Sequence, residues 1–173
     1  MRKQKDEAFT YEAWSPLPPE DRVHFSGLSY FPPSERWRVV AKVTRLDDGQ
    51  VFDMATSTGE PRRQRRAARL DFSTPEGPAS LFAYEDASHG HGHGPQSLFV
   101  PFRDKTSGRE SYGAGRYLDL DVPHGDELVV DFNLAYNPYC AYSESYSCPL
   151  PPSENWLEIP VPAGERQFKP ESA

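Results

Sequence analysis

The chain is poor in cysteine, in methionine and in long apolar runs. Of its 173 residues, two are Cys and two are Met. No apolar run approaches the ~20 residues that a membrane-spanning helix needs, so we expect no membrane partner. The first residues, from Met1 to Glu7, are charged and lack the apolar stretch of a secretory signal. We therefore expect a cytoplasmic protein.

The sequence also lacks the motifs of several well-known enzyme classes. It contains no Gly-x-Ser-x-Gly, His-Glu-x-x-His, Cys-x-x-Cys or phosphate-binding P-loop. Gly113-Ala114-Gly115 precedes strand-like residues, so it lacks the helix N-terminus that holds a dinucleotide. The sequence thus indicates no cofactor. A Ser/His/Asp triad stays open, because its members need not be close in sequence.

Positive charge is in the minority, with 19 Lys and Arg against 26 Asp and Glu and a net charge of −7. Nucleic-acid binding depends on a positive surface that releases counterions, so we expect no nucleic-acid partner. The stretch from Arg62 to Arg69 is nevertheless basic. Arginines could hold an anion there, but we prefer an edge strand that charge protects from association.

What the chain does have is proline, 18 residues, and an aromatic share of 13%. Proline disfavours long helices and central strands, which favours short strands and turns. Apolar residues alternate with polar ones from Trp37 to Thr44, as in a strand with one buried face. Further strands are predicted near residues 51–56, 65–72, 80–84, 97–102, 116–122 and 127–132, with Asp47-Asp48-Gly49 as a hairpin turn between the first two strands.

This spacing of strands, without helical patterns between them, predicts a mainly β fold: an antiparallel barrel or sandwich. We expect one domain over residues 1–173. A short N-terminal helical and extended arm, residues 1–34, would pack on a β core of residues 35–173. A Pro-rich C-terminal coil would wrap across that core.

Three histidines alternate with glycines from Ser88 to Gly94. Imidazoles bind zinc, copper or nickel, so this run is the obvious metal candidate. However, the glycines make the loop costly to order, and no carboxylate or cysteine at a fixed spacing completes a ligand set. We interpret the run as a low-complexity loop and predict no metal site.

The most distinctive stretch runs from Asp131 to Asn155. It gathers four tyrosines, three asparagines, two cysteines and acidic groups between prolines. Amides and phenols on stiff side chains suit a polar pocket of fixed geometry. Alternatively, the stretch is an ordered coil whose Asn and Asp cap turns and whose Tyr cover the core.

Cys140 and Cys148 leave three alternatives. A disulfide between them would contribute about 2–3 kcal/mol in the chain-entropy model, although a reducing cytoplasm disfavours it. Buried structural thiols are the commonest state of cytosolic cysteines. A reactive pair would need a lowered pKa from a nearby cation such as Arg116. Structural cysteines rank first, a redox or nucleophilic role second and metal binding last.

Several motifs resemble a family of bacterial and archaeal proteins known only as a domain of unknown function. They are Pro-Phe-x-Asp-x-Thr-Ser-Gly at 101–108, Tyr-Gly-Ala-Gly-Arg-Tyr-Leu at 112–118, Asp-Phe-Asn-x-Ala-Tyr-Asn-Pro-Tyr-Cys-Ala-Tyr at 131–142, Cys-Pro-Leu-Pro-Pro-x-Glu-Asn at 148–155 and Ala-Gly-Glu at 163–165. The resemblance covers nearly the whole chain. It implies no activity, but it draws attention to these blocks as the place to look for a site.

We therefore expect a small-ligand-binding β domain whose polar and aromatic pocket lies between residues 104–117 and 131–155. The ligand would be small and anionic or polar. The expected binding residues are Tyr112, Arg116, Asp131, Asn133, Tyr136, Asn137, Tyr139 and Asn155.

Two alternatives stay open. One is an enzyme on the same surface, hydrolase-like or thiol-dependent, with catalytic candidates Asp104, Thr106, Cys140 and Glu154. The other is a purely structural clasp for the coil.

Overall fold

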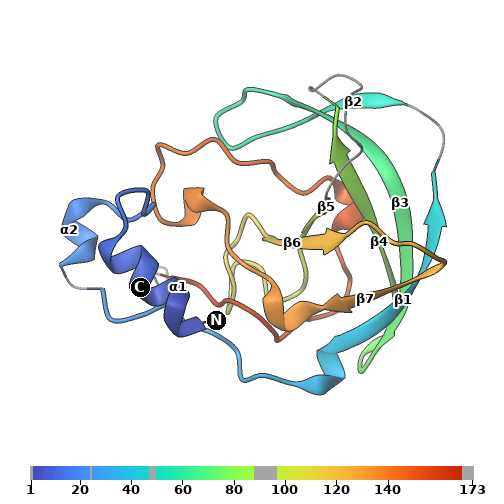
Figure 1. Ribbon diagram of the computed structural model, residues 1–173, viewed down its shortest axis with the longest axis horizontal. Coiled ribbons are helices and arrows are strands. Elements are labelled where there is room, and N and C mark those ends of the chain that lie inside the picture. The colour runs from blue at the N-terminus through green and yellow to red at the C-terminus, as the bar shows by residue number, and fades with distance from the viewer. Residues whose placement is uncertain (1, 24, 47–49, 88–96, 169–173) are drawn as a thin grey trace.

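The computed structural model describes residues 2–23, 25–46, 50–87 and 97–168. Its centre is one antiparallel sheet that curls into a half-barrel (Figure 1), so the predicted mainly β fold is confirmed. The strands are β1 (Arg38–Arg45), β2 (Val51–Met54), β3 (Arg62–Thr74), β4 (Gly77–Asp86), β5 (Ser97–Phe102), β6 (Arg116–Asp121) and β7 (Glu127–Asp131).

The strand order is β6-β5-β4-β3-β1-β7, and β2 also pairs with β3. β3 and β4 form a hairpin whose register closes at Thr74 and Gly77. The turn lies in the segment Pro75-Glu76-Gly77-Pro78, and the positive φ of Gly77 suits a tight reversal of the chain. β5 and β6 also pair along their length, from Ser97 opposite Asp121 to Phe102 opposite Arg116.

The predicted hairpin between the first two strands is wrong. β1 pairs with β3 and β7, and β2 pairs with β3 instead of β1. The reason is the length of β3: its first residues pair with β2 and its later ones with β1. Both strands run antiparallel to β3 and lie one after the other along the same edge of it. β1 and β2 therefore point in the same direction. The residues of the expected turn, 47–49, lie outside the described part of the chain.

The main core lies against one face of this sheet. Alternate residues of β1, β3, β4, β5 and β6 pack with Trp37, Phe132, Leu157 and Val161. Phe132 is fully buried and contacts three other rings, those of Trp37, Phe72 and Phe102. The coil after β7 therefore supplies five of the twenty buried residues of this core, and the sheet alone could not bury this face.

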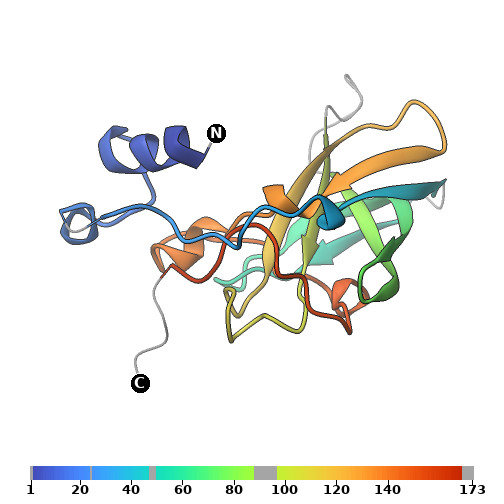
Figure 2. The ribbon, with the colours of Figure 1, turned by 90° about the horizontal axis from the view of Figure 1, so that it is seen from below.

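Short helices and coil make up most of the rest. The helices are α1 (Arg2–Tyr11), α2 (Pro19–Arg22) and the 3₁₀ turns η1 (Glu35–Trp37), η2 (Phe132–Leu134), η3 (Tyr139–Ala141) and η4 (Ser153–Asn155). Figure 2 shows α1 and α2 to one side of the curled sheet, joined to it by an extended segment. A second apolar cluster of Phe9, Leu17 and Tyr142 holds the arm in place. Among the described residues, no helix is both long and apolar enough to cross a membrane.

Candidate functional site

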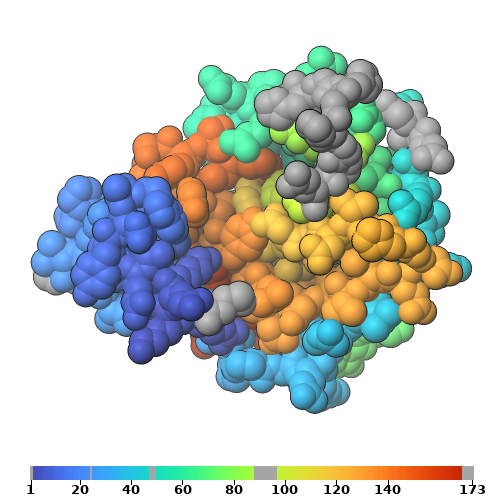
Figure 3. All heavy atoms as spheres, viewed as in Figure 1, coloured from blue at the N-terminus to red at the C-terminus, as the bar shows by residue number. Residues whose placement is uncertain are grey.

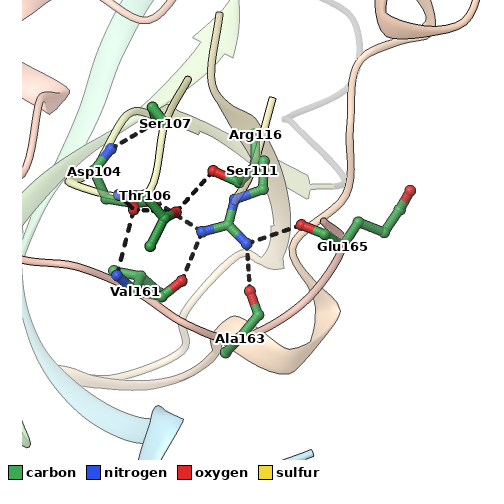
Figure 4. A network of polar contacts seen from close by, with 8 residues as sticks. All are labelled: Asp104, Thr106, Ser107, Ser111, Arg116, Val161, Ala163 and Glu165. Atoms are coloured by element: carbon green, nitrogen blue, oxygen red, sulfur yellow. Dashed lines mark hydrogen bonds and ion pairs between the residues drawn. The ribbon is translucent and has the colours of Figure 1, made fainter. Parts of the chain in front are cut away.

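Arg116, the first residue of β6, is completely buried on the core side of the sheet. Its Nη2 donates to Asp104 Oδ2 at 2.8 Å and to the Val161 carbonyl at 2.9 Å. Its Nη1 donates to the carbonyls of Ala163 and, at 3.2 Å, Glu165. Figure 4 shows these acceptors arranged around the guanidinium. All four Nη hydrogens are therefore used within the chain.

Burial lowers the pKa of Arg116, and the neighbouring Asp104 carboxylate raises it in turn. Arginine is so basic that it stays charged even here. A buried charge is costly unless it is paired and hydrogen-bonded, which the four acceptors provide. Since the side chain is fully buried and its four Nη hydrogens are engaged within the chain, this guanidinium serves the fold first.

Asp104 and Thr106, two of the catalytic candidates, belong to the same buried network. Asp104 Oδ1 accepts from the Thr106 amide at 2.6 Å and from its hydroxyl at 2.5 Å. The Thr106 hydroxyl also lies 2.7 Å from Ser111 Oγ. These bonds are those of an Asx turn, in which a carboxylate replaces backbone acceptors and fixes the loop. The turn then presents Asp104 to Arg116.

Two glycines in this region are required by space. Gly115 has a φ of +105°, and a Cβ there would lie 2.5 Å from the Phe102 carbonyl oxygen. Gly164 has a φ of +81°, and its Cβ would lie 2.7 Å from the Ala135 carbonyl oxygen. Both conditions exclude an ordinary side chain. The glycines thus let the backbone beside Arg116 approach its neighbours.

The predicted asparagines and Glu154 likewise connect the coil to distant parts of the chain. Asn133 exchanges hydrogen bonds with the backbone of Ser34 and also donates to Asp131. Asn137 donates to the carbonyl of Arg166 at 2.9 Å. Glu154 accepts from Arg66 and from the Tyr84 hydroxyl. These contacts lie apart from one another, so the predicted residues do not converge on one cavity.

A groove of about 780 Å³ lies on the opposite face of the sheet. Because side chains alternate along a strand, the neighbours of core residues in β4, β5 and β6 point to this face. In Figure 3 the dark-blue α1, the orange coil after β7 and the yellow β6 meet on the viewed side. The groove's lining includes eight aromatic side chains: Phe9, Trp14, Tyr84, Phe99, Tyr117, Tyr136, Tyr139 and Tyr146.

The rings of the groove pack edge to face. The centroids of Phe99 and Tyr117 are 4.7 Å apart, and those of Tyr117 and Tyr136 are 5.7 Å apart. Tyr139 and Tyr146 form another such pair at 5.3 Å. Tyr139 and Trp14 are 39% and 51% exposed, which leaves their faces free for contact. Such an arrangement offers a ligand both stacking surfaces and a rigid floor.

Charged groups border the aromatic surface. Lys5 Nζ pairs with Glu165 at 2.5 Å and also lies 5.3 Å from the centre of the Tyr136 ring. Arg62 donates to the Ser147 carbonyl at 2.6 Å. Two acids of the groove already have partners, since Asp119 accepts from the Tyr136 hydroxyl and Glu85 pairs with Arg65. Burial, followed by Asp119, raises the pKa of Tyr136, so this phenol stays a neutral donor.

The groove shares one wall with the predicted pocket. Tyr136, Tyr139 and the segment from Tyr146 to Pro149 line it, as does Tyr117. Its other walls are α1 and the outward face of β3 to β6, in place of residues 104–116. The residues that line this groove but were not predicted as binding residues include Phe9, Trp14, Arg62, Gln64, Tyr84 and Phe99. Phe99 and Tyr117 had a signal in the sequence, because each is an aromatic residue on the side of a predicted strand that faces away from the core.

A second hollow, of about 920 Å³, lies between β6 and β7. Asp119, Asp121, Glu127 and Asp131 make it acidic, and Arg38 is its basic member. Asp131, a predicted binding residue, therefore belongs to a different surface from Tyr136 and Tyr139. Within the described ranges, no three His, Cys, Asp or Glu side chains come together as ligands for a metal ion. The His/Gly run lies in residues 88–96, outside those ranges.

Tyr112 and Cys140 are brought together, with 3.6 Å between the hydroxyl and Sγ. The Cys140 amide donates to Cys148 Sγ at 3.4 Å. Both cysteines are free thiols; Cys140 is half-buried and Cys148 is buried. Of the four catalytic candidates, Cys140 is the one whose reactive atom is not fixed by turn or ion-pair contacts.

Fold and groove together define a half-barrel β domain whose outer face carries an aromatic groove capped by an N-terminal helix. The chain belongs to the family "Protein of unknown function (DUF1684)", whose model matches residues 23–166. This confirms the resemblance at the level of an uncharacterised family. The matched range begins after α1, so the helical wall of the groove lies outside it.

A solved structure is closely similar over almost the entire chain. It is the NMR structure of an uncharacterised protein from Haloarcula marismortui, with 46% sequence identity and a TM-score of 0.73. The similarity covers 95% of this chain and 89% of the other. No curated protein matches the chain. Function therefore has to be argued from the site.

Proposed function

We propose that the protein binds a small aromatic anion in the groove lined by α1, the outward face of β3 to β6 and the coil from Tyr136 to Pro149. The observation that carries this proposal is the density of aromatic rings around a groove of about 780 Å³. Small-molecule sites commonly have volumes of ~300–1,000 Å³ and largely apolar linings with a few polar groups. Five of the eight rings are at least partly exposed, and a contiguous exposed apolar patch is a mark of a binding surface.

The hydrogen-bond donors of the groove favour an anionic ligand over a cation. Glu85 and Asp119 are already engaged by Arg65 and Tyr136. Lys5 and Arg62 each carry several donor hydrogens, and one described contact does not use them all. A flat ligand could stack against Tyr139 or Trp14 while its carboxylate meets one of these cations.

The helical arm is part of the proposed site. We therefore propose that residues 1–173 form one domain. Phe9 and Trp14 line the groove, and Phe9 packs edge to face on Tyr142 at 5.1 Å. Asp6 Oδ1 accepts from the Leu28 amide at 2.9 Å, which fixes α1 against the extended segment. Residues of the arm and of the coil thus hold the wall in place together.

The test is an NMR titration of the full chain with 2-naphthoate. Two matched probes accompany it: decahydro-2-naphthoate, which keeps the charge but not the aromaticity, and 2-naphthylmethylammonium, which reverses the charge. We expect 2-naphthoate to bind most tightly and to shift amides of residues 136–149 and of α1. Shifts scattered over the surface, or equal binding of all three probes, would contradict the proposal.

Two tyrosine variants locate the binding. Tyr139→Ala removes an exposed ring from the groove and should weaken 2-naphthoate binding by roughly three- to tenfold, as one aromatic contact is worth about 0.5–1.5 kcal/mol. Tyr11→Ala removes a ring that is 80% exposed and lies outside the groove. It should bind as the wild type does. Equal affinity of the two variants would place the ligand elsewhere.

A further inference from the structure

Cys140 and Cys148 lie in contact at the start of the coil that borders the groove. Cys140 is in η3, and its amide donates to Cys148 Sγ at 3.4 Å. Cys148 is fixed in turn, because its amide donates to Ser57 Oγ at 3.1 Å and its carbonyl accepts from the Ser57 amide at 2.9 Å. The Cys148 sulfur is thus held against the Cys140 backbone, so a disulfide between the two residues needs only local rearrangement.

The two thiols are not equivalent. Cys140 is half-buried and receives the Tyr112 hydroxyl at 3.6 Å, whereas Cys148 is buried. The pKa of Cys140 is lowered to about 6, because the Cys148 thiol donates to it; burial opposes this, and Tyr112 and Ser57 add to it. The pKa of Cys148 is raised, since it keeps its proton to donate to Cys140 and is itself desolvated. The more accessible sulfur is thus the thiolate.

We propose that Cys140 and Cys148 form a redox-active pair in which Cys140 reacts with a hydroperoxide and Cys148 resolves the product as an intramolecular disulfide. The Cys140 thiolate attacks the distal peroxide oxygen, the O–O bond breaks, and the leaving alkoxide takes a proton from solvent. Cys140 is then a sulfenic acid. Cys148 attacks its sulfur, the S–O bond breaks, and water leaves with the thiol proton.

The balance of this sequence is two thiols and one hydroperoxide in, and one disulfide, one alcohol and one water out. Two electrons pass from the sulfurs to the peroxide oxygen. A thiol reductant would restore the pair by exchange. The activity is independent of the aromatic groove, although Cys148 also lines it.

The first test is the pH dependence of labelling with iodoacetamide. A thiol with a pKa near 6 is mostly ionised at neutral pH, but its thiolate is a weaker nucleophile than that of an ordinary cysteine. Compared with a free peptide cysteine of pKa about 8.5, Cys140 should react about tenfold faster at pH 6 and no faster at pH 8. A constant ratio across this range would overturn the assignment of Cys140 as the thiolate.

The second test follows oxidation of the full, reduced chain by hydrogen peroxide. Mass spectrometry should show one disulfide between peptides containing Cys140 and Cys148, reversed by dithiothreitol. In Cys148→Ser, the sulfenic acid at Cys140 should persist and react with dimedone, whereas Cys140→Ser should give no adduct. Disulfides only between chains, or an adduct at Cys148 first, would overturn the proposal.

A matched pair of tyrosine variants separates chemistry from folding. Tyr112→Phe keeps the ring but removes the hydroxyl that meets Cys140, so iodoacetamide labelling at pH 6 should slow while the circular dichroism spectrum stays unchanged. Tyr11→Phe removes an exposed hydroxyl far from both sulfurs and should label at the wild-type rate. Equal rates for the two variants would show that Tyr112 does not stabilise the Cys140 thiolate.

Discussion

At the scale of single residues, the motif side chains mainly connect segments that are distant in sequence. Arg116 joins the turn at Asp104 to the carbonyls of Val161, Ala163 and Glu165, which lie 45 to 49 residues later. Its guanidinium is planar and presents its donors in a fixed fork. One side chain can thus donate to four buried acceptors at once. The contribution of such a residue to stability depends on the buried acceptors that its replacement would leave without a donor.

Replacing Arg116 by Met should strongly destabilise the protein. Met fills a comparable volume but leaves the Asp104 carboxylate buried without its cation and removes the described donor of the Ala163 and Glu165 carbonyls. Removing one partner of a buried ion pair typically costs about 3–5 kcal/mol. Urea unfolding followed by circular dichroism would measure the loss.

Arg69→Met is the matched control for that measurement. Arg69 pairs with Asp71 at 3.1 Å, but its side chain is 51% exposed. Exposed ion pairs contribute little, so the free energy of unfolding should change by less than about 1 kcal/mol. If Arg116→Met were as stable as Arg69→Met, the buried network would not be what holds residues 161–165 on the sheet.

The sequence could single out Arg116, Asn133 and Asn155, but it could not assign their partners. Their residue types promise several directional hydrogen bonds, and both a ligand and a distant backbone segment can accept them. Which acceptor is present depends on how the coil crosses the sheet, and no local spacing encodes that path. The residue types were therefore informative, whereas their partners follow from the path of the coil across the sheet.

At the scale of elements, periodicity located the strands well. Ser97–Phe102 was predicted with its observed bounds, because it is a short apolar run rich in residues that favour strands. The hairpin between β1 and β2 failed because a turn signal says nothing about strand pairing. That pairing was decided by β3, whose 13 residues are long enough to accept two strands on one edge.

Asn155 compensates for a gap between β4 and β5. Among the described residues, these two strands pair directly only at Tyr84 and Phe99. Asn155 is fully buried beside them; it accepts from the Phe82 amide at 2.8 Å and donates to the carbonyls of Phe82 and Pro101. The amide side chain thus replaces the missing part of the ladder and connects η4 to the sheet.

Asn155→Ala should cost roughly 2–4 kcal/mol, since three backbone groups would lose their partners in the interior. Hydrogen exchange at the Phe82 amide should accelerate more than exchange at the Leu70 amide in β3. Ser153→Ala, on the exposed side of the same 3₁₀ turn, should leave both unchanged. Wild-type exchange at Phe82 in Asn155→Ala would show that water or a neighbouring strand replaces the amide.

At the scale of the whole molecule, the candidate groove arises from three parts of the chain that no sequence pattern links. The tyrosine-rich coil was recognisable from its composition. The facing wall was not, because Phe9 and Trp14 reach it only through the cluster in which Phe9 packs with Leu17 and Tyr142. The same assembly buries many phenols, and that burial has a consequence for the stability of the whole protein.

The protein should lose stability steeply above pH 10. Burial is the main reason that the pKa values of Tyr84, Tyr117 and Tyr142 are raised, and Glu154, Cys148 and Glu165 are respectively the next causes. A folded-state pKa above the unfolded value of about 10 contributes stability that is complete below pH 10 and is lost as pH rises. At pH 11 each unfolded phenol gains about 1.4 kcal/mol by ionising, so the three together should lower the free energy of unfolding by roughly 4 kcal/mol relative to pH 8.

Urea midpoints between pH 8 and pH 11, with absorbance at 295 nm to follow ionisation, would measure this loss of stability. Tyr84→Phe should reduce the pH-dependent loss by about 1.4 kcal/mol at pH 11. A wild-type stability that is flat to pH 11 would mean that these phenols ionise as readily in the folded chain as in the unfolded one.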